Sequence, residues 1–335
     1  MRKKTGLFWA AVAISCFCSV LWGGAAEIDD QLMASRRVFP TIGPGLRALR
    51  LGSDGKFYAL TSPGTSVAIF DAKGAALAKV PDYAQNAGPT SPELRAIEFG
   101  EDMDVARNGA VYVADRGANA VKVWEKDGSA HEFHVAAPVS LAALPDGEVA
   151  VISLQQTHLV TVYDSNGRVV REFGDAQSVS SRPDLDRYAN LGRLASDPQG
   201  HLYYGFTYLP EPLVRQYDRF GYAGQSFEFT GLDAFPEAQA TRKEIERLEK
   251  RNTPPLLPPI LTAFGVDPVS GEVWMGLQNT LIHFDKQGNR LSEYQVYTPK
   301  GARIEASVIL VEEDQLLIGS DPLGIYEFPR PDRKR

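Results

Sequence analysis

Two acidic residues, Asp102 and Asp104, stand two positions apart, a spacing that puts both side chains on the same side of a β-strand. Arg50 and Arg193 hold the matching positions in two other apolar stretches of similar pattern. Carboxylates from such strands could ligate a hard cation such as Ca²⁺ where they converge. Alternatively, they could form ion pairs with the arginines around a polar channel, and this is the interpretation we favour.

Other familiar kinds of catalytic site have less support in the sequence. The histidines fall on predicted outer strands, turns and loops rather than at one point, which argues against a zinc centre: His131, His134, His158, His201 and His283. Neither a G-x-S-x-G nucleophile elbow nor a G-x-x-x-x-G-K-[ST] phosphate loop occurs. We therefore expect no catalytic residue.

The elements that would position these residues form a repeat. A hairpin turn such as Asn108–Gly109 opens each unit, and an aromatic residue, an acid, two residues and a glycine close it, as in Trp124–Glu125 with Gly128. The two glycines are 19, 19, 20, 21 and 17 residues apart in the first five units, and the sixth unit, ending at Tyr326–Glu327, lacks them. Glycine permits the positive φ of a tight turn, the acid can accept backbone N–H groups, and the aromatic can pack between sheets.

A four-stranded unit cannot bury both of its faces alone, so the units must stack, and radial stacking gives a β-propeller. The second unit, with Tyr112–Asp115, Val121–Trp124 and Gly128, resembles an NHL repeat. The resemblance extends over roughly residues 37–328 and implies an all-β, six-bladed propeller of four-stranded antiparallel blades. Propellers of this group usually act as binding or scaffolding modules, and a minority are enzymes.

The repeat also predicts the boundaries of the domain. Residues 27–335 form the propeller, with blades at about 44–81, 100–136, 137–174, 193–231, 260–298 and 304–329. The sixth blade lacks an outermost strand, and residues 37–42 have no blade of their own. We expect the segment 37–42 to supply that strand and close the ring, which would protect an exposed edge.

The long insertions, residues 82–98, 175–192 and 232–259, all connect one blade to the next. They therefore lie on one side of the disc, the loop face, together with the loops between the two middle strands of each blade. Loops on a rigid scaffold often carry function. The last insertion should contain one short helix, with Thr241 and Glu244 as a capping box and Ile245 and Leu248 on one side. This helix is either a lid or docking element, or it packs on the disc.

Candidate binding residues on the loop face are polar or aromatic side chains: Asp115, Arg116, Asn119, Tyr208, Glu211, Gln278, Asn279 and Asp321. Any one of them could instead shape its own loop by hydrogen bonding, as an acid after a strand often does. The channel candidates are Arg50, Asp102, Asp104 and Arg193, lining the axis at alternate positions of the first strands.

The N-terminus has the pattern of a signal peptide over residues 1–26, with basic Arg2–Lys4, an apolar stretch, and Gly24–Ala26 before the cleavage point. A retained membrane anchor is the alternative, and a lipoprotein signal at Cys16 fits less well because the apolar run continues beyond it. Export would place the protein in the periplasm or outside the cell. Both cysteines, Cys16 and Cys18, lie in this segment, so the mature chain would have no disulfide.

The net charge of −7 becomes more negative once the basic leader is removed, which argues against nucleic acid as a partner. The basic C-terminus from Arg330 to Arg335 should be a solvated end. We expect a monomeric, non-catalytic module that binds a protein, peptide or glycan through the loop face and needs no cofactor. The alternative is a lactonase-like hydrolase or a lyase with a cation, for example Ca²⁺, at the channel mouth.

Overall fold

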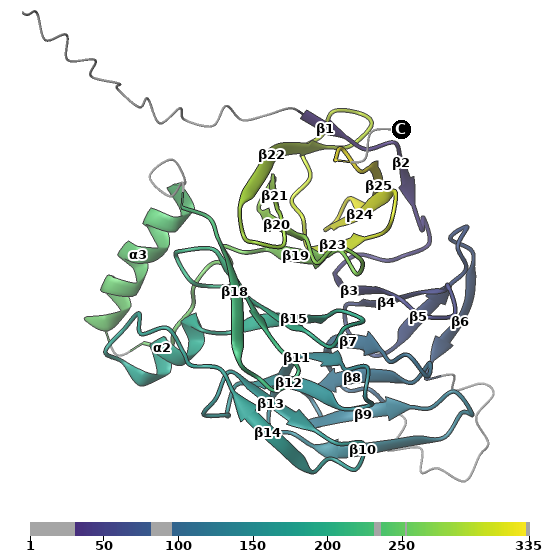
Figure 1. Cartoon of the computed structure of the whole chain (residues 1–335), viewed down its shortest axis with the longest axis horizontal. Helices are drawn as coiled ribbons and strands as arrows, with labels where there is room; N and C mark the ends of the chain where they lie inside the picture. Colours follow the sequence, from purple (N-terminus) through teal and green to yellow (C-terminus); the bar gives the residue numbers. More distant parts are fainter. Residues whose placement is uncertain (1–30, 82–95, 231–235, 252, 333–335) are drawn as a thin grey trace, which may run out of the picture.

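The computed structural model describes residues 31–81, 96–230, 236–251 and 253–332. The predicted signal peptide and most of the insertion 82–98 lie outside these ranges. The described chain forms six sheets arranged in a ring (Figure 1). Consecutive inner strands lie next to one another, and the last lies next to the first, so the ring is closed.

Each sheet is built from consecutive antiparallel strands that run from the centre outwards. The strands of blades 1 to 3 are β3 (Leu46–Leu51), β4 (Phe57–Thr61), β5 (Val67–Phe70), β6 (Ala76–Val80); β7 (Gly100–Val105), β8 (Val111–Asp115), β9 (Ala120–Trp124), β10 (Ala130–His134); and β11 (Pro138–Ala143), β12 (Val149–Ser153), β13 (Val160–Tyr163), β14 (Val169–Phe173). Those of blades 4 to 6 are β15 (Gly192–Ser196), β16 (Leu202–Phe206), β17 (Leu213–Tyr217), β18 (Ala223–Glu228); β19 (Ala263–Val266), β20 (Val273–Leu277), β21 (Thr280–Phe284), β22 (Arg290–Tyr297); and β23 (Val308–Val311), β24 (Gln315–Ser320), β25 (Gly324–Pro329).

In blades 1, 3, 4 and 5 the closing turn uses its acid as the sequence predicts. Oδ1 of Asp71 accepts hydrogen bonds from the backbone N–H groups of Lys73 (2.9 Å) and Ala75 (2.8 Å). Asp164, Asp218 and Asp285 make the same pair of bonds in their own turns. In blade 2 the equivalent acid is glutamate, and Asp127 takes over by accepting from the N–H of Ser129. Each turn thereby satisfies its own backbone donors.

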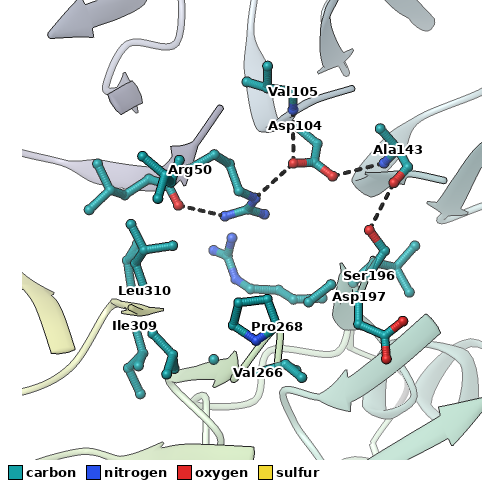
Figure 2. A pocket seen from close by; sticks show the side chains of 18 of the residues that line it. Arg50, Asp104, Val105, Ala143, Ser196, Asp197, Val266, Pro268, Ile309 and Leu310 are labelled. Carbon is teal, nitrogen blue, oxygen red and sulfur yellow. Dashed lines mark hydrogen bonds and ion pairs between the residues drawn. The ribbon is translucent and has the colours of Figure 1, made fainter. Parts of the chain in front are cut away.

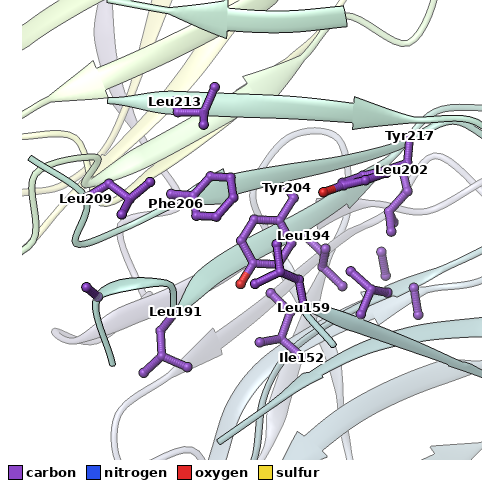
Figure 3. Close-up of a cluster of buried hydrophobic side chains, with 14 of the residues drawn as sticks. Ile152, Leu159, Leu191, Leu194, Leu202, Tyr204, Phe206, Leu209, Leu213 and Tyr217 are labelled. Atoms are coloured by element: carbon purple, nitrogen blue, oxygen red, sulfur yellow. The ribbon is translucent and has the colours of Figure 1, made fainter. Parts of the chain in front are cut away.

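Six clusters of buried apolar side chains occupy the interfaces between neighbouring blades among the described residues. Figure 3 shows one of them, between blades 3 and 4, where Ile152 and Leu159 meet Leu194 and Tyr204. The predicted aromatic residue of a blade meets a phenylalanine of the preceding one: Phe39 with Phe70, Phe133 with Tyr163, Phe173 with Tyr217, and Phe227 with Phe284. Burial between blades, rather than within them, therefore holds the ring together.

The N-terminal segment closes the ring as predicted, although the strand is shorter. β2 (Arg36–Val38) pairs antiparallel with β25 as the fourth strand of blade 6, and Phe39 packs against Phe57 and Phe70 in blade 1. The sequence did not predict β1 (Gln31–Met33), which adds to blade 5 in parallel with β22.

Among the described residues, two helices are present where one was predicted. α2 (Pro183–Ala189) lies in the insertion 175–192, and α3 (Pro236–Glu249) lies in the last insertion. The predicted capping box is wrong, because the helix begins at Pro236 and the side chain of Thr241 is buried inside it. Ile245 and Leu248 pack into the interface of blades 3 and 4 as expected. α3 lies beside blade 4, away from the inner strands (Figure 1), which agrees with packing on the disc rather than with a lid over the channel.

Candidate functional site

A cavity of about 470 Å³ lies among the inner strands of all six blades. Each inner strand pairs with one neighbour only, so its other edge faces this channel. Consecutive residues such as Leu194, Ala195 and Ser196 therefore line it, and the expectation that only alternate positions would do so is wrong. Of the four channel candidates, Arg50, Asp104 and Arg193 line the cavity, whereas Asp102 is completely buried beside it.

Side chains from blades 1 to 4 join the inner strands to one another. Arg50 Nη2 lies 3.3 Å from Asp102 Oδ1, and its Nε lies 3.4 Å from Asp104 Oδ1. Asp102 also accepts a 2.5 Å hydrogen bond from Ser140 Oγ, and Asp104 accepts one of 2.8 Å from the N–H of Ala143. Ser140 Oγ in turn accepts from the N–H of Leu194 in blade 4 at 3.0 Å. The acids thus satisfy arginine and backbone donors along the channel wall.

The electrostatics of this wall do not suit a hard cation. Burial raises the pKa of Asp104, and the charge of Arg50 opposes that rise. Both carboxylates already accept hydrogen bonds, and a positive guanidinium lies between them. A Ca²⁺ ion needs six to eight oxygen ligands, and it would have to displace Arg50 to gain these two. The site therefore has the form of an ion-pair network.

Arg193 crosses the channel. It projects from β15 in blade 4, and its Nη1 donates a 3.2 Å hydrogen bond to the carbonyl oxygen of Arg47, in blade 1 on the opposite side of the ring. No carboxylate of the described chain lies within ion-pair distance of this guanidinium, while Arg47 is paired with Glu101 at 2.7 Å. Arg193 thus presents a partly buried positive charge with most of its N–H donors unused.

The other side of the channel is apolar. Blades 5 and 6 contribute Phe264, Val266, Ile309 and Leu310 to the lining. In Figure 2, Val266 and Ile309 lie across the cavity from Asp104, and Leu310 lies beside Arg50. The channel is therefore amphipathic in cross-section.

A second group of side chains lies on the loop face where β3 and β7 begin. The guanidinium carbons of Arg47 and Arg116 lie 4.3 Å and 5.1 Å from the centre of the Phe99 ring. Both arginines also pair with Glu101, at 2.7 Å and 3.0 Å. We call Arg47, Phe99, Glu101 and Arg116 the loop-face cluster. It carries one net positive charge, and the Arg116 side chain is 43% exposed.

Asp115 is buried and does not itself form part of the exposed surface. Its two carboxylate oxygens accept hydrogen bonds of 2.9 Å from the backbone N–H groups of Glu98 and Phe99. Lys122 Nζ lies 3.7 Å from Asp115 Oδ2. Asp115 thus holds in place the segment that presents Phe99 to the loop-face cluster.

Four further candidates shape loops, three of them by side-chain hydrogen bonds and one by its backbone conformation. Asn119 Oδ1 accepts from the N–H of Ala137, and Asp321 Oδ1 accepts from the N–H of Gly45, both at 2.9 Å. Asn279 Nδ2 donates to Gln295 Oε1, and Gln278 adopts a positive φ of 55°. The three side-chain hydrogen bonds fit the alternative given in the sequence analysis, in which a candidate residue shapes its loop instead of binding a partner.

The last two candidates connect the loop face to the helices. Tyr208 packs against Tyr188 of α2, with ring centres 4.9 Å apart and the ring planes tilted by 36°. Burial, with Tyr188 beside it, raises the pKa of Tyr208 to about 12. It therefore remains a neutral phenol at physiological pH. Glu211 accepts a hydrogen bond from Arg242 Nε of α3 at 3.1 Å. Of the predicted loop-face residues, Arg116 and Tyr208 fit a binding role best.

One group elsewhere has the geometry of a metal site, namely Glu272, His283 and Asp332, whose ligand atoms lie within 4.8 Å of one another. Arg330 donates to Asp332 (2.7 Å) and to Glu272 (3.2 Å), and to Asp267 at 2.5 Å. The expectation of a solvated end is wrong for Arg330, which is buried and anchors the C-terminus between blades 5 and 6. Its guanidinium supplies the positive charge that these carboxylates need.

Sequence reasoning missed Arg47, Phe99, Glu101 and Tyr188. Phe99 and Glu101 flank the start of β7, and Glu101 lies at a register shift in the pairing of β7 with β8. Arg47 lies at the same kind of shift in blade 1. The available signal was an extra charged residue at the start of an inner strand. Taking alternate positions along the strand as channel-lining misses this residue, because the register shifts there.

The comparisons with known proteins support the fold. No protein-family profile matches the chain, and no curated protein sequence is detectably similar. A solved structure of a catalytically inactive virginiamycin B lyase from Staphylococcus aureus with quinupristin is 12% identical, with a TM-score of 0.54 over 87% of this chain and 82% of that one. A streptogramin B lyase structure is 13% identical, with a TM-score of 0.53 over 88% of this chain and 86% of that one. The WD40 repeats of RRP9 are 14% identical, with a TM-score of 0.54 over 89% of this chain and 99% of that one. The chain is thus a six-bladed β-propeller whose structural neighbours include both enzymes and WD40 repeats.

Within the described ranges, no helix is long and apolar enough to cross a bilayer.

Proposed function

We propose that this protein is an exported, NHL-like propeller that acts without catalysis and binds a protein, peptide or glycan through its loop face. The observation that carries the proposal is the loop-face cluster. Phe99 lies against two arginines that are both held by Glu101, so the aromatic ring and the charges are pre-positioned. Aromatic and arginine side chains are the residues that dominate the energetics of many interfaces.

The surroundings of the cluster support the same function. The packed pair of Tyr188 and Tyr208 adds an aromatic surface supported by α2. The excess of arginine over carboxylate here, in a chain of net charge −7, favours an acidic group on the partner.

Catalysis has weaker support. Asp102 and Asp104 are engaged by Arg50, Ser140 and backbone donors, which leaves poor ligands for the cation that a lactonase-like site would need. One neighbouring lyase is inactive after a histidine-to-alanine change, whereas no histidine of this chain lines the cavity. Metal analysis of the purified protein tests this alternative. A stoichiometric Ca²⁺ that is lost in the variant Asp102→Asn would favour the enzyme.

The binding proposal can be tested by site-specific crosslinking in the native host. A photo-reactive amino acid at Arg116 should trap a specific partner. The same group at Phe220 should not, because Phe220 is exposed in a closing turn of blade 4, on the opposite side of the disc, which we call the turn face. The purified partner should then bind Phe99→Ala and Arg116→Ala at least ten-fold more weakly. The matched control Arg219→Ala, beside Phe220, should bind normally. Equal binding by all variants would overturn the assignment of the loop face.

The destination and oligomeric state belong to the same proposal. Cleavage after Ala26 would release a monomer into the periplasm or the medium, and retention of residues 1–26 would tether the propeller to a membrane. N-terminal sequencing of the exported protein distinguishes the two. Light scattering of the purified protein checks the monomer.

A further inference from the structure

We propose that the central channel is a second binding site, separate from the loop face, for a small amphipathic carboxylate that enters from the turn face. The carboxylate would bind Arg193, and the hydrocarbon or aromatic body would lie against blades 5 and 6. This inference does not depend on the proposed loop-face function, because it uses the interior of the ring.

The cavity opens on the turn face. Its lining there includes the turn residues Ser53, Arg107, Pro145, Pro198 and Pro268, all of which are exposed. At the other end, Arg193 extends across the channel to the carbonyl oxygen of Arg47 and forms a floor. A ligand would therefore reach the guanidinium with its polar end after entering between the turns.

The charge at the floor favours an anion. Arg47 is paired with Glu101, and Arg50 with Asp102 and Asp104, whereas the described chain offers Arg193 only the single carbonyl contact. A guanidinium has five N–H donors in a planar fork that matches a carboxylate. Because it is partly buried, its attraction for an anion is screened less than at the surface.

The opposite wall favours an apolar body. Phe264, Val266 and Leu310 line the cavity and remain half-buried in the described structure, so a ligand could cover apolar surface that is still exposed. The volume of about 470 Å³ falls within the range of roughly 300–1,000 Å³ for small-molecule sites. These features together define a ligand with one anionic group and a compact apolar remainder.

The first test uses the unmodified protein and three ligands of equal chain length. In isothermal titration calorimetry, octanoate should bind with a negative heat-capacity change, which marks burial of apolar surface. Octanol and octylammonium should bind at least ten-fold more weakly, because they lack the anionic group. Equal binding of the three ligands, or no binding of octanoate at millimolar concentration, would overturn the proposal.

The second test locates the site. Arg193→Met keeps an unbranched apolar stem and removes the charged guanidinium, and it should weaken octanoate binding at least ten-fold with little effect on octanol. Leu310→Asn should weaken both ligands. The matched control Arg219→Met, on an outer turn of blade 4, should bind octanoate normally, and thermal unfolding checks that each variant is folded. Unchanged octanoate binding by Arg193→Met would place the site elsewhere.

A further variant separates this proposal from the loop-face function. Phe99→Ala should lose the loop-face partner and retain octanoate binding, because Phe99 does not line the cavity. Arg193→Lys, which keeps the charge but not the planar fork, should bind octanoate with intermediate affinity. Loss of octanoate binding in Phe99→Ala would contradict the independence of the two sites.

Discussion

Arg193 and Arg47 belong to blades on opposite sides of the ring, yet a 3.2 Å hydrogen bond joins the Nη1 of the first to the carbonyl oxygen of the second. This contact ties blade 4 to blade 1 across the axis. It also marks the boundary between the loop-face cluster, at one end of the channel, and the mouth of the cavity at the other. A single propeller can thus present a macromolecular surface and a small-molecule cavity, with Arg47 belonging to the loop-face cluster and also lining the cavity.

The ion-pair network around Arg50 should be a major source of stability. Arg50→Met would leave the carboxylates of Asp102 and Asp104 buried without their cation, and we expect the free energy of unfolding to fall by about 3 kcal/mol at pH 7. Chemical denaturation of the two proteins under identical conditions measures this difference.

The same variant should show a characteristic pH dependence. Burial already raises the pKa of Asp104, and without Arg50 it should rise further, so the folded state takes up a proton more readily as the pH falls. The loss in free energy of unfolding caused by Arg50→Met should therefore be smaller at pH 5 than at pH 7. The double variant Arg50→Met/Asp104→Asn should recover part of it at pH 7. If this loss of stability does not change with pH, Arg50 acts through packing alone.

The blade architecture could be predicted from the sequence because its signals are local. An acid such as Asp218 accepts N–H groups two and four residues later, and Gly221 supplies the positive φ of the same turn. Such contacts need no knowledge of the rest of the chain. The blade count and the closing strand follow from repeating this pattern along the sequence.

The candidate site was harder to predict because it is made by ring closure. The contact of Arg193 with Arg47 joins residues 146 positions apart, and nothing near either residue indicates it. Arg116 was predicted as an exposed residue, but its partner Phe99 was not, since Phe99 is positioned by the buried carboxylate of Asp115. The start of α3 was predicted wrongly because Thr241 and Glu244 have capping-box spacing, while Pro236 begins the helix five residues earlier.

The C-terminal ion pair gives a prediction at low pH. Burial alone would raise the pKa of Asp267, but the hydrogen bond and charge of Arg330, with the N–H groups of Val269 and Ser270, lower it to about 2. The unfolded value is about 3.9, so the carboxylate stabilises the fold above about pH 4, and this contribution is lost as the pH falls towards 2.

Asp267→Asn should therefore reduce the free energy of unfolding at pH 7 by about 1–2 kcal/mol, after allowance for solvent screening. Its stability should also change less than that of the unmodified protein between pH 4 and pH 2. The exposed Asp314→Asn serves as the control. Parallel pH profiles for Asp267→Asn and the unmodified protein would be evidence against the ion pair.

Arg182 links the two helices of the insertions and should control the end of α3. Its Nη1 donates to the carbonyl oxygens of Leu248 (2.6 Å) and Arg251 (2.5 Å), and its Nη2 to that of Thr253 (2.9 Å). Arg182→Ala removes these donors, and local opening of the last turn should become easier by about 1–2 kcal/mol. Hydrogen exchange over residues 245–251 should accelerate roughly ten-fold, while the outward-facing control Arg187→Ala leaves it unchanged. Unaltered exchange would mean that packing of Leu248 alone holds the turn.

Alanine substitutions at two turn glycines should distinguish the cost of backbone strain from the cost of disturbed packing between blades. Gly221 and Gly128 occupy equivalent turns with similar φ values, 92° and 85°. A Cβ at Gly221 would lie 2.5 Å from the ring of Phe173 in the preceding blade, whereas a Cβ at Gly128 would have no heavy atom within 4 Å. Gly128→Ala should cost only the strain of a positive φ, about 1 kcal/mol. Gly221→Ala should cost about 2–4 kcal/mol, because it also forces Phe173 away from Tyr217. Denaturant titration of both variants measures the difference in free energy of unfolding. Equal values for the two variants would show that the contact of Phe173 with Tyr217 rearranges with no loss of stability.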